Sequence, residues 1–178
     1  MVAQQALQKL TLVLGGAASG KSAFAEALVN RAGRGRVYLA TAQAFDAEMA
    51  EKIAVHRTAR GAGWHTVEAP QDIAAPLAAV SPNDIVLLDC ATLWLSNRLL
   101  ANADLAATPA EMLAALGACP APVVVVSNEV GQGIVPERAM GRVFRNAQGR
   151  LNQVLAAEAG LVVQVIAGLP LVLKGQLP

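Results

Sequence analysis

Short apolar runs alternate with amphipathic stretches along the chain. The runs at 85–89 and 123–127 are almost wholly apolar, and the second holds four consecutive valines. Such runs are typical of strands that are buried on both faces of a sheet. Elsewhere, apolar residues recur at spacing four over 45–60, which indicates one apolar stripe on a helix. Because strands and helices alternate, the pattern predicts an α/β fold, a mostly parallel sheet with helices on both faces.

The same pattern covers most of the chain, and no linker or internal repeat divides it. We therefore expect a single domain over residues 1–178. Predicted strands cover 10–14, 36–41, 64–68, 85–89, 123–127 and 161–167, with an edge strand at 171–174. Predicted helices cover 21–31, 45–60, 71–80, 93–100, 109–116 and 137–159, the last with a candidate break near Gly149.

Composition excludes several classes of protein. Hydrophobic residues make up 54% of the chain and charged residues 15%, so disorder is not expected. Net charge is +1 and no basic run is present, so we expect no nucleic-acid partner. No apolar segment is long enough for a membrane span or a signal peptide. Cys90 and Cys119 stand in apolar stretches and predict buried thiols in a reducing compartment, which favours a soluble, cytoplasmic protein.

A phosphate-binding loop is predicted between the first strand and the first helix. The loop matches the pattern G-x-x-x-x-G-K-[ST], and its residues are Gly15, Gly16, Ala17, Ala18, Ser19, Gly20, Lys21 and Ser22. Glycines let backbone N–H groups turn toward phosphate oxygens, and the following helix N-terminus favours negative charge. Lys21 would bridge the β- and γ-phosphates, and Ser22 would ligate Mg²⁺. The strand–loop–helix context disfavours the alternative, a chance glycine turn.

Asp89 is the second candidate metal ligand. It ends the apolar run at 85–89, where a carboxylate would hold Mg²⁺ directly or through water. A helix N-cap or a solvated strand end is the alternative.

The predicted helix at 45–60 carries a histidine on its charged face. Glu48, Lys52, His56 and Arg60 follow at spacing four, and Arg57 is adjacent to His56. Neutral imidazole is a good nucleophile at neutral pH, and the two arginines could hold phosphates. From the pattern alone, a solvated helix face is the commoner explanation.

Several segments together resemble those of one enzyme family, and they follow one another in the family's order. The segments are 15–22, 38–43, 45–49, 56–60 with Trp64, 89–95, 127–136, 149–153 and 167–170. The chain thereby resembles the adenosylcobinamide kinase / adenosylcobinamide-phosphate guanylyltransferase family of cobalamin biosynthesis, over nearly its whole length. The histidine element at 56–60 and the run at 128–136 are much more specific than the phosphate loop.

The resemblance implies two reactions. A nucleoside triphosphate, ATP in the kinase step, phosphorylates the aminopropanol hydroxyl of adenosylcobinamide. GTP then donates GMP to that phosphate, with release of pyrophosphate and with Mg²⁺ as metal. The resemblance makes His56 the nucleophile that carries a guanylyl group, and Lys21 a second catalytic residue. It also implies a homotrimer, with GTP bound between the loop and the histidine's helix.

The resemblance further implies nucleotide-binding residues outside the loop. They are Ala40, Thr41, Ala42, Arg57, Thr58, Ala59, Arg60, Glu68 and Asp89. Two positions depart from the family pattern: Ala18 stands where arginine is usual, and Ala42 where serine is common. The departure at Ala18 leaves the triphosphate of the kinase step open.

The run at 128–136 follows a predicted strand. Asn128, Glu129 and the loop at Gly131 and Gly133 are candidates for the cobinamide site, with a structural turn as the equal alternative.

Three other functions stay open at this point. A plain phosphate-loop kinase would use no histidine, and a regulatory protein would have lost catalysis. A GTP-dependent switch is disfavoured because Thr92 stands where such switches carry glycine, and Glu129 where they carry lysine.

Overall fold

The computed structural model describes residues 7–43, 51, 58 and 61–178. The predicted helix at 45–60 therefore lies almost entirely outside the described residues. In chain order the elements are β1 (Leu10–Gly15), α1 (Lys21–Arg31), β2 (Gly35–Ala40), β3 (Trp64–Glu68), α3 (Ala74–Ala78), β4 (Asp84–Asp89), α4 (Ala91–Leu100), α5 (Thr108–Ala118), β5 (Val123–Asn128), α6 (Ala139–Glu158), β6 (Leu161–Ile166) and β7 (Leu169–Lys174).

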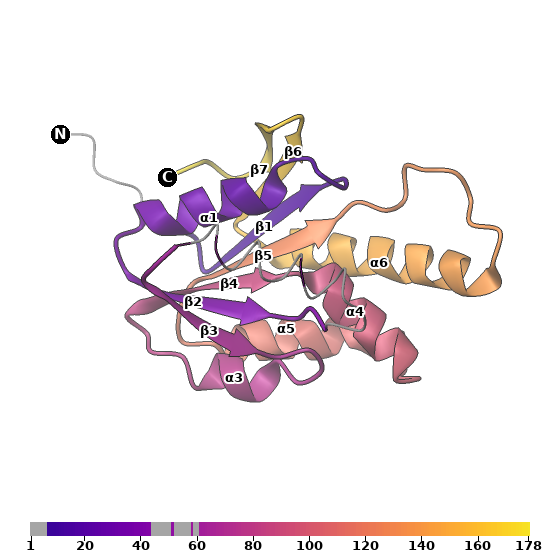
Figure 1. The fold of residues 1–178 in the computed structure, drawn as a ribbon, viewed down its shortest axis with the longest axis horizontal. Helices are drawn as coiled ribbons and strands as arrows, with labels where there is room; N and C mark the ends of the chain where they lie inside the picture. The colour runs from indigo at the N-terminus through magenta and orange to yellow at the C-terminus, as the bar shows by residue number, and fades with distance from the viewer. Residues whose placement is uncertain (1–6, 44–50, 52–57, 59–60) are drawn as a thin grey trace.

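The described strands form one seven-stranded sheet in the order β3-β2-β4-β5-β1-β6-β7 (Figure 1). Every neighbouring pair is parallel except β6 and β7, which are antiparallel. The predicted α/β class with a mostly parallel sheet is thus confirmed. The antiparallel edge follows from a two-residue turn at Ala167 and Gly168, whose φ angles of 52° and 78° suit a tight hairpin.

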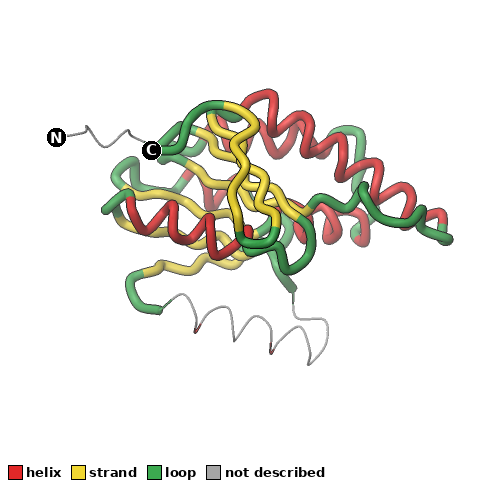
Figure 2. The backbone as a smooth tube through the Cα atoms, turned by 90° about the horizontal axis from the view of Figure 1, so that it is seen from above, coloured by secondary structure: helices red, strands yellow, loops and turns green. Residues whose placement is uncertain are grey.

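Helices cover both faces of the sheet, as Figure 2 shows. The strands alternate their side chains between two apolar clusters. Val124 and Val126 pack with α1 residues, whereas Val123 and Val125 pack with α3, α4, α5 and α6. The near-continuous apolar sequence of β5 is therefore explained by burial on both sides.

Two predicted helices differ from those observed. The helix predicted at 71–80 is only Ala74–Ala78, because Asp72 Oδ1 accepts a hydrogen bond from Ala74 N–H (2.9 Å) and fixes a turn before the helix. The break considered near Gly149 does not occur, since α6 runs unbroken from Ala139 to Glu158. Membrane-spanning helices are absent from the described part of the chain.

Candidate functional site

The predicted site residues of the described chain gather where the parallel strands end. Gly15 of β1 is the register partner of Asn128 in β5, and Ala40 of β2 is the partner of Asp89 in β4. The carboxyl ends of these strands therefore share one edge of the sheet. In open α/β sheets this edge is where ligands bind.

The loop at 15–22 has the backbone that phosphate binding requires. Ala18 and Gly20 have left-handed φ angles of 54° and 90°, which turn successive backbone groups inward. A Cβ on Gly20 would lie 3.1 Å from Gly168 Cα, so only glycine fits without movement. Gly168 N–H also donates to Ser19 C=O (2.8 Å). The hairpin turn between β6 and β7 thus supports the loop from behind.

Lys21 opens helix α1 at the end of this loop. Its Nζ donates to the carbonyl of Gly16 (3.0 Å), which holds the ammonium over the first loop residues. A lysine here, beside exposed backbone at Gly16, Ala17 and Ala18, is placed to meet an anion bound in the loop. Ser22 follows in the first turn of the helix.

Asp89 is half-buried at the end of β4. Tyr38 of β2 donates its hydroxyl to Asp89 Oδ2 (3.2 Å), which orients the carboxylate. The next residue, Cys90, is buried, and its thiol accepts a hydrogen bond from Leu93 N–H at the start of α4. Burial, reinforced by the charge of Asp89, raises the pKa of Cys90 to about 11. Cys90 is therefore a protonated thiol at neutral pH and no nucleophile.

The donor set fits a magnesium ion. Ser22 offers a hydroxyl oxygen and Asp89 a carboxylate, both hard oxygen ligands. Within the described ranges, no group of three histidine, cysteine, aspartate or glutamate side chains could hold a metal ion. Mg²⁺ commonly uses only one or two protein oxygens, with substrate phosphates and water supplying the rest.

Thr41 links the ends of β2 and β4. Its hydroxyl, fully buried, donates to the carbonyl of Cys90 (2.8 Å) and accepts from the N–H of the same residue (2.8 Å). The predicted nucleotide-binding position Thr41 is therefore also a structural one. Ala42, next in the chain, is half-buried at the same edge.

Glu68, at the end of β3, lies further from the loop than Ala40 and Asp89 at the ends of β2 and β4. Four strand spacings separate β3 from β1, so Glu68 and Gly15 are roughly 19 Å apart. Its side chain is exposed. A nucleotide whose phosphates occupy the loop could reach Glu68 only with the end that carries the base.

Four predicted residues, His56, Arg57, Ala59 and Arg60, lie outside the described residues. Thr58 is described and exposed.

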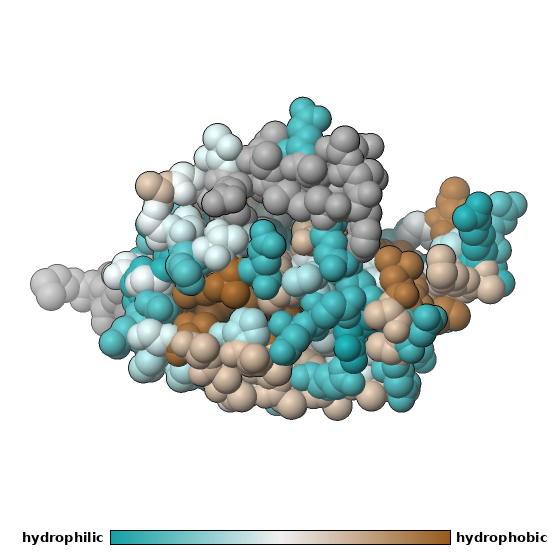
Figure 3. Space-filling model, turned by 60° about the horizontal axis from the view of Figure 1, so that its bottom comes forward, coloured by the Kyte–Doolittle hydropathy of each residue, from teal (hydrophilic) through white to brown (hydrophobic). Residues whose placement is uncertain are grey.

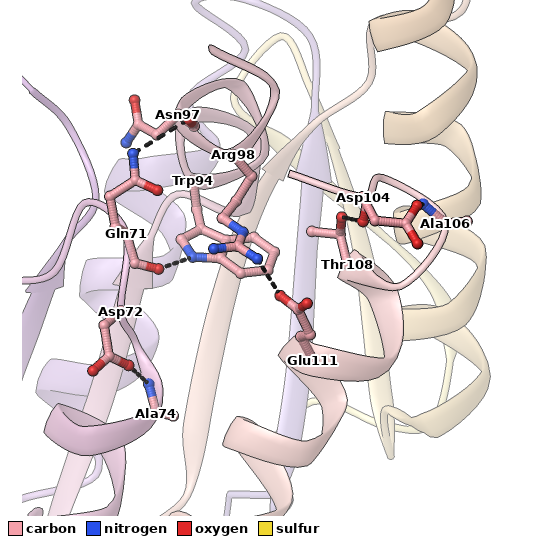
Figure 4. A network of polar contacts seen from close by, with 10 residues as sticks. All are labelled: Gln71, Asp72, Ala74, Trp94, Asn97, Arg98, Asp104, Ala106, Thr108 and Glu111. Carbon is pink, nitrogen blue, oxygen red and sulfur yellow. Dashed lines mark hydrogen bonds and ion pairs between the residues drawn. The ribbon is translucent and has the colours of Figure 1, made fainter. Parts of the chain in front are cut away.

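Sequence reasoning missed a set of buried contacts beneath this edge (Figure 4). Asn97 of α4 is 3% exposed, and its Nδ2 donates to the carbonyls of Thr41 and Pro70, each at 2.8 Å. Gln71 Nε2 donates to Asn97 C=O (3.3 Å), and Trp94 Nε1 donates to Gln71 C=O (2.8 Å). These bonds hold the segments that follow β2 and β3. The only sequence signal was a polar residue among the apolar positions of a predicted helix.

Comparison with known proteins assigns the family. The sequence profile of the family described as "Cobinamide kinase / cobinamide phosphate guanyltransferase" matches residues 11–173. The "Bifunctional adenosylcobalamin biosynthesis protein CobP" of Pseudomonas aeruginosa is 42% identical over 168 residues, which cover 93% of this chain and 97% of that protein. The protein of Escherichia coli named "Bifunctional adenosylcobalamin biosynthesis protein CobU" is 40% identical over 185 residues, covering 93% and 99%.

Solved structures agree on the fold alone. The flagellar accessory protein FlaH from Methanocaldococcus jannaschii has a TM-score of 0.54 at 10% identity, covering 98% of this chain and 82% of that one. An ATPase from a bacterial type III secretion system has a TM-score of 0.53 at 10% identity, covering 93% and 57%. With the family profile and the relatives at about 40% identity, the chain belongs to the cobinamide kinase / cobinamide phosphate guanyltransferase family and is a transferase.

Proposed function

We propose that this protein catalyses two successive transfers on one corrinoid substrate. In the first, a nucleoside triphosphate phosphorylates the aminopropanol hydroxyl of adenosylcobinamide. In the second, GTP donates GMP to adenosylcobinamide phosphate, giving adenosylcobinamide-GDP and pyrophosphate. The observation that carries the proposal is the loop at 15–22, which opens α1 at the same sheet edge as Asp89 in a chain of this family.

The phosphate loop serves both transfers. Backbone N–H groups around Ala18 and Gly20 and the start of α1 would hold phosphate oxygens. Lys21 would leave the carbonyl of Gly16 and neutralise charge on the outer phosphates. Ser22 and Asp89 would hold Mg²⁺, which supplies charge neutralisation across the phosphates when bound. ATP is proposed for the kinase step, with GTP as the nucleotide of the second.

We propose His56 as the nucleophile of the second transfer. Its neutral imidazole nitrogen attacks the α-phosphorus of GTP, so that an N–P bond forms and the P–O bond to pyrophosphate breaks. A phosphate oxygen of adenosylcobinamide phosphate then attacks the same phosphorus and releases the imidazole. Arg57 and Arg60 would contact the phosphates, and Ala40, Thr41, Ala42, Thr58, Ala59 and Glu68 complete the proposed nucleotide site.

The corrinoid is proposed to meet the arm, which we define as residues 129–138 between β5 and α6. The arm extends beyond the carboxyl end of β5 (Figure 1). Glu129 Oε1 accepts from Gly131 N–H (2.6 Å), and Arg142 donates to the carbonyls of Pro136 (3.0 Å) and Glu137 (2.6 Å). The arm therefore has a turn at its start and is joined to α6 at its end, and Ile134 is 97% exposed between these points. The arm begins next to the phosphate loop, where Glu129 N–H bonds to Gly15 C=O (3.0 Å), and its exposed apolar side chains suit a large, partly apolar substrate.

Two further parts of the proposal concern the cell and the assembly. We place the reaction in the cytoplasm, where buried, unpaired thiols such as Cys90 and Cys119 stay reduced. We also propose a homotrimer. The number of subunits rests on the family resemblance, and the exposed apolar side chains of the arm and of the β6–β7 hairpin would form its contacts.

The experiment supplies ATP labelled at the γ-phosphate and GTP labelled at the α-phosphate, with adenosylcobinamide as acceptor. We expect the wild type to give corrinoid phosphate that carries γ-label from ATP, and a final corrinoid product that carries α-label from GTP. His56→Ala should lose α-label and keep γ-label, whereas Lys21→Met should lose both. If the wild type phosphorylates the corrinoid but never transfers α-label to it, the protein is a kinase only and the proposed second transfer is wrong.

A further inference from the structure

A buried polar network lies where β5 ends, between α4 and α6, and the reaction proposed above does not use it. Gln148 and Asn152 lie one turn apart on α6 and are 0% and 7% exposed. Gln148 Nε2 donates to Ser127 Oγ (2.9 Å) and to Asn152 Oδ1 (2.9 Å), and Ser127 Oγ donates to Asn152 Oδ1 (2.6 Å). Burying these polar side chains costs desolvation energy that apolar side chains of the same size would not cost. The network therefore suggests a functional role.

The network ends on the backbone of Asn128. Thr92 Oγ1 accepts from Asn128 N–H (2.8 Å), and Asn152 Nδ2 donates to Asn128 C=O (3.1 Å). The pairing of β5 with β4 ends two residues before Asn128, whereas the pairing with β1 continues to Gly15. Glu129 N–H bonds to Gly15 C=O (3.0 Å), so the backbone groups of Glu129 face β1. Because successive residues of a strand face opposite neighbours, the N–H and C=O of Asn128 face β4, which has already ended. Thr92 and Asn152 supply the partners of these two groups instead.

The side chain of Asn128 lies on the opposite face of the sheet from the network. Ser127 faces α6, whereas Val126 packs in the cluster beneath α1, so alternation places Asn128 on the α1 side. Asn128 is half-buried there, about 4.8 Å from Gly15 at ordinary strand spacing. Lys21 is held over the first loop residues, and the lysine of such loops reaches the β- and γ-phosphates, so the outer phosphates of a bound triphosphate would lie beside Asn128.

We propose that Thr92, Gln148 and Asn152 are positioning residues that set the Asn128 carboxamide to donate a hydrogen bond to the outermost phosphate of a triphosphate on the loop. The inference rests on the proposed function for the triphosphate itself. The carboxamide N–H₂ is a donor suited to an anionic oxygen, and its placement depends on a backbone held from three sides. Asn128 would therefore distinguish a triphosphate from a diphosphate.

The direct test is Asn128→Ala, which leaves every backbone bond of the network in place. Affinities for the β,γ-imido analogue of GTP and for GDP are measured by calorimetry with Mg²⁺. We expect the triphosphate analogue to bind at least about tenfold more weakly, since hydrogen bonds to charged groups are strong, and GDP to change by less than about twofold. Equal losses for both ligands, or no loss for either, would overturn the proposal.

The positioning role is tested with Thr92→Val, a change of nearly equal volume that removes the acceptor of Asn128 N–H. We expect Thr92→Val to lose affinity for the triphosphate analogue, and not for GDP, to the same extent as Asn128→Ala. The double variant should lose no more affinity than either single variant, and Thr92→Ser should bind like the wild type. Thr11→Val is the matched control, because Thr11 is fully buried at the far end of β1 and its hydroxyl has no partner among the described residues. A loss in the control equal to that in Thr92→Val, or multiplying losses in the double variant, would contradict the role.

The outcomes separate this inference from the proposed function. If Thr92→Val does not fold, Asn128→Ala still tests whether Asn128 contacts the outermost phosphate. Wild-type protein that binds the triphosphate analogue but transfers neither phosphoryl nor GMP would contradict only the proposed function, and the affinity ratio would still test Asn128. Wild-type protein that binds no triphosphate would overturn both.

Discussion

Two glycines of the phosphate loop should differ in how well they tolerate replacement by alanine. Gly20 has a φ of 90° and would place a Cβ 3.1 Å from Gly168 Cα, whereas Gly16 has open space around it. We predict that Gly20→Ala lowers the free energy of unfolding by about 1–2 kcal/mol, and Gly16→Ala by less than about 0.5 kcal/mol. Urea denaturation without nucleotide measures both. Equal effects would mean that the loop adjusts its backbone freely.

Cys90 gives a prediction about alkaline pH. Burial first, and then the charge of Asp89, raises the pKa of this thiol from 9.0 to about 11. The unfolded chain therefore loses its proton at lower pH than the folded chain does. The stabilisation is fully present below pH 9 and is lost as pH rises toward about 11. Cys90→Ala should therefore have a flatter stability curve in that window, measured by urea midpoints. A curve parallel to that of the wild type would contradict the account.

At this scale the sequence indicated residues with a local motif, such as Lys21 and Asp89. It did not indicate Asn97, and it placed Asn152 in a family segment without indicating its contacts, because the partners of both amides are far away in the chain. Asn97 bonds to Thr41, 56 residues earlier, and Asn152 bonds to Asn128, 24 residues earlier. In the sequence, a buried amide appears only as a polar residue on an otherwise apolar helix face. The neighbouring residues do not indicate which group it will hydrogen-bond.

The strands of the sheet were the most predictable elements. The four valines that begin β5 (Val123–Asn128) are buried on both faces because helices cover both sides of the sheet, and β-branched residues favour a strand over a buried helix there. Helix ends were less predictable, since they depend on individual side-chain bonds. Asp72 shortens α3 at its start, and Cys90 starts α4 two residues earlier than predicted.

Helix α6 allows a paired test of glycine. Gly149 lies inside the helix with nothing within 4 Å of an added Cβ, whereas a Cβ on Gly141 would lie 2.9 Å from Pro136 Cβ. We predict that Gly149→Ala raises the free energy of unfolding by about 0.5–1 kcal/mol, the usual gain of alanine over glycine in a helix. Gly141→Ala should show none of this gain. A destabilised Gly149→Ala would indicate a strained helix, measured for both variants by thermal denaturation.

In the part of the chain that the structure describes, exposed large apolar side chains gather on the arm and on the β6–β7 hairpin. Ile134 and Val135 of the arm are 97% and 59% exposed, and Leu169 and Leu171 of β7 are 71% and 52% exposed. Figure 3 shows the arm projecting at the right of the molecule, with hydrophobic atoms on it. Separate apolar patches on two distant parts of one chain suit contacts with two neighbours, as a ring of identical subunits requires.

For the proposed homotrimer we predict a solution mass about three times that of the 18.3 kDa chain, measured by light scattering. Leu171→Lys should lower this mass, because a charge on the hairpin opposes burial there. Leu100→Lys is the control, since Leu100 is 57% exposed at the end of α4 and belongs to neither the arm nor the hairpin. A monomeric wild type, or a Leu171→Lys variant that behaves like the control, would contradict the proposed assembly.

The central claim is covalent guanylyl transfer through His56, and intact mass measures it most directly. Purified protein is incubated with GTP and Mg²⁺ and without corrinoid. The chain has two histidines, so His65→Ala, at an exposed position on β3, is the matched control for His56→Ala. We predict a mass gain of one guanylyl group, labile in acid, in the wild type and in His65→Ala, and none in His56→Ala. Protein that binds GTP without any mass gain, or that keeps the gain after His56→Ala, would contradict the account.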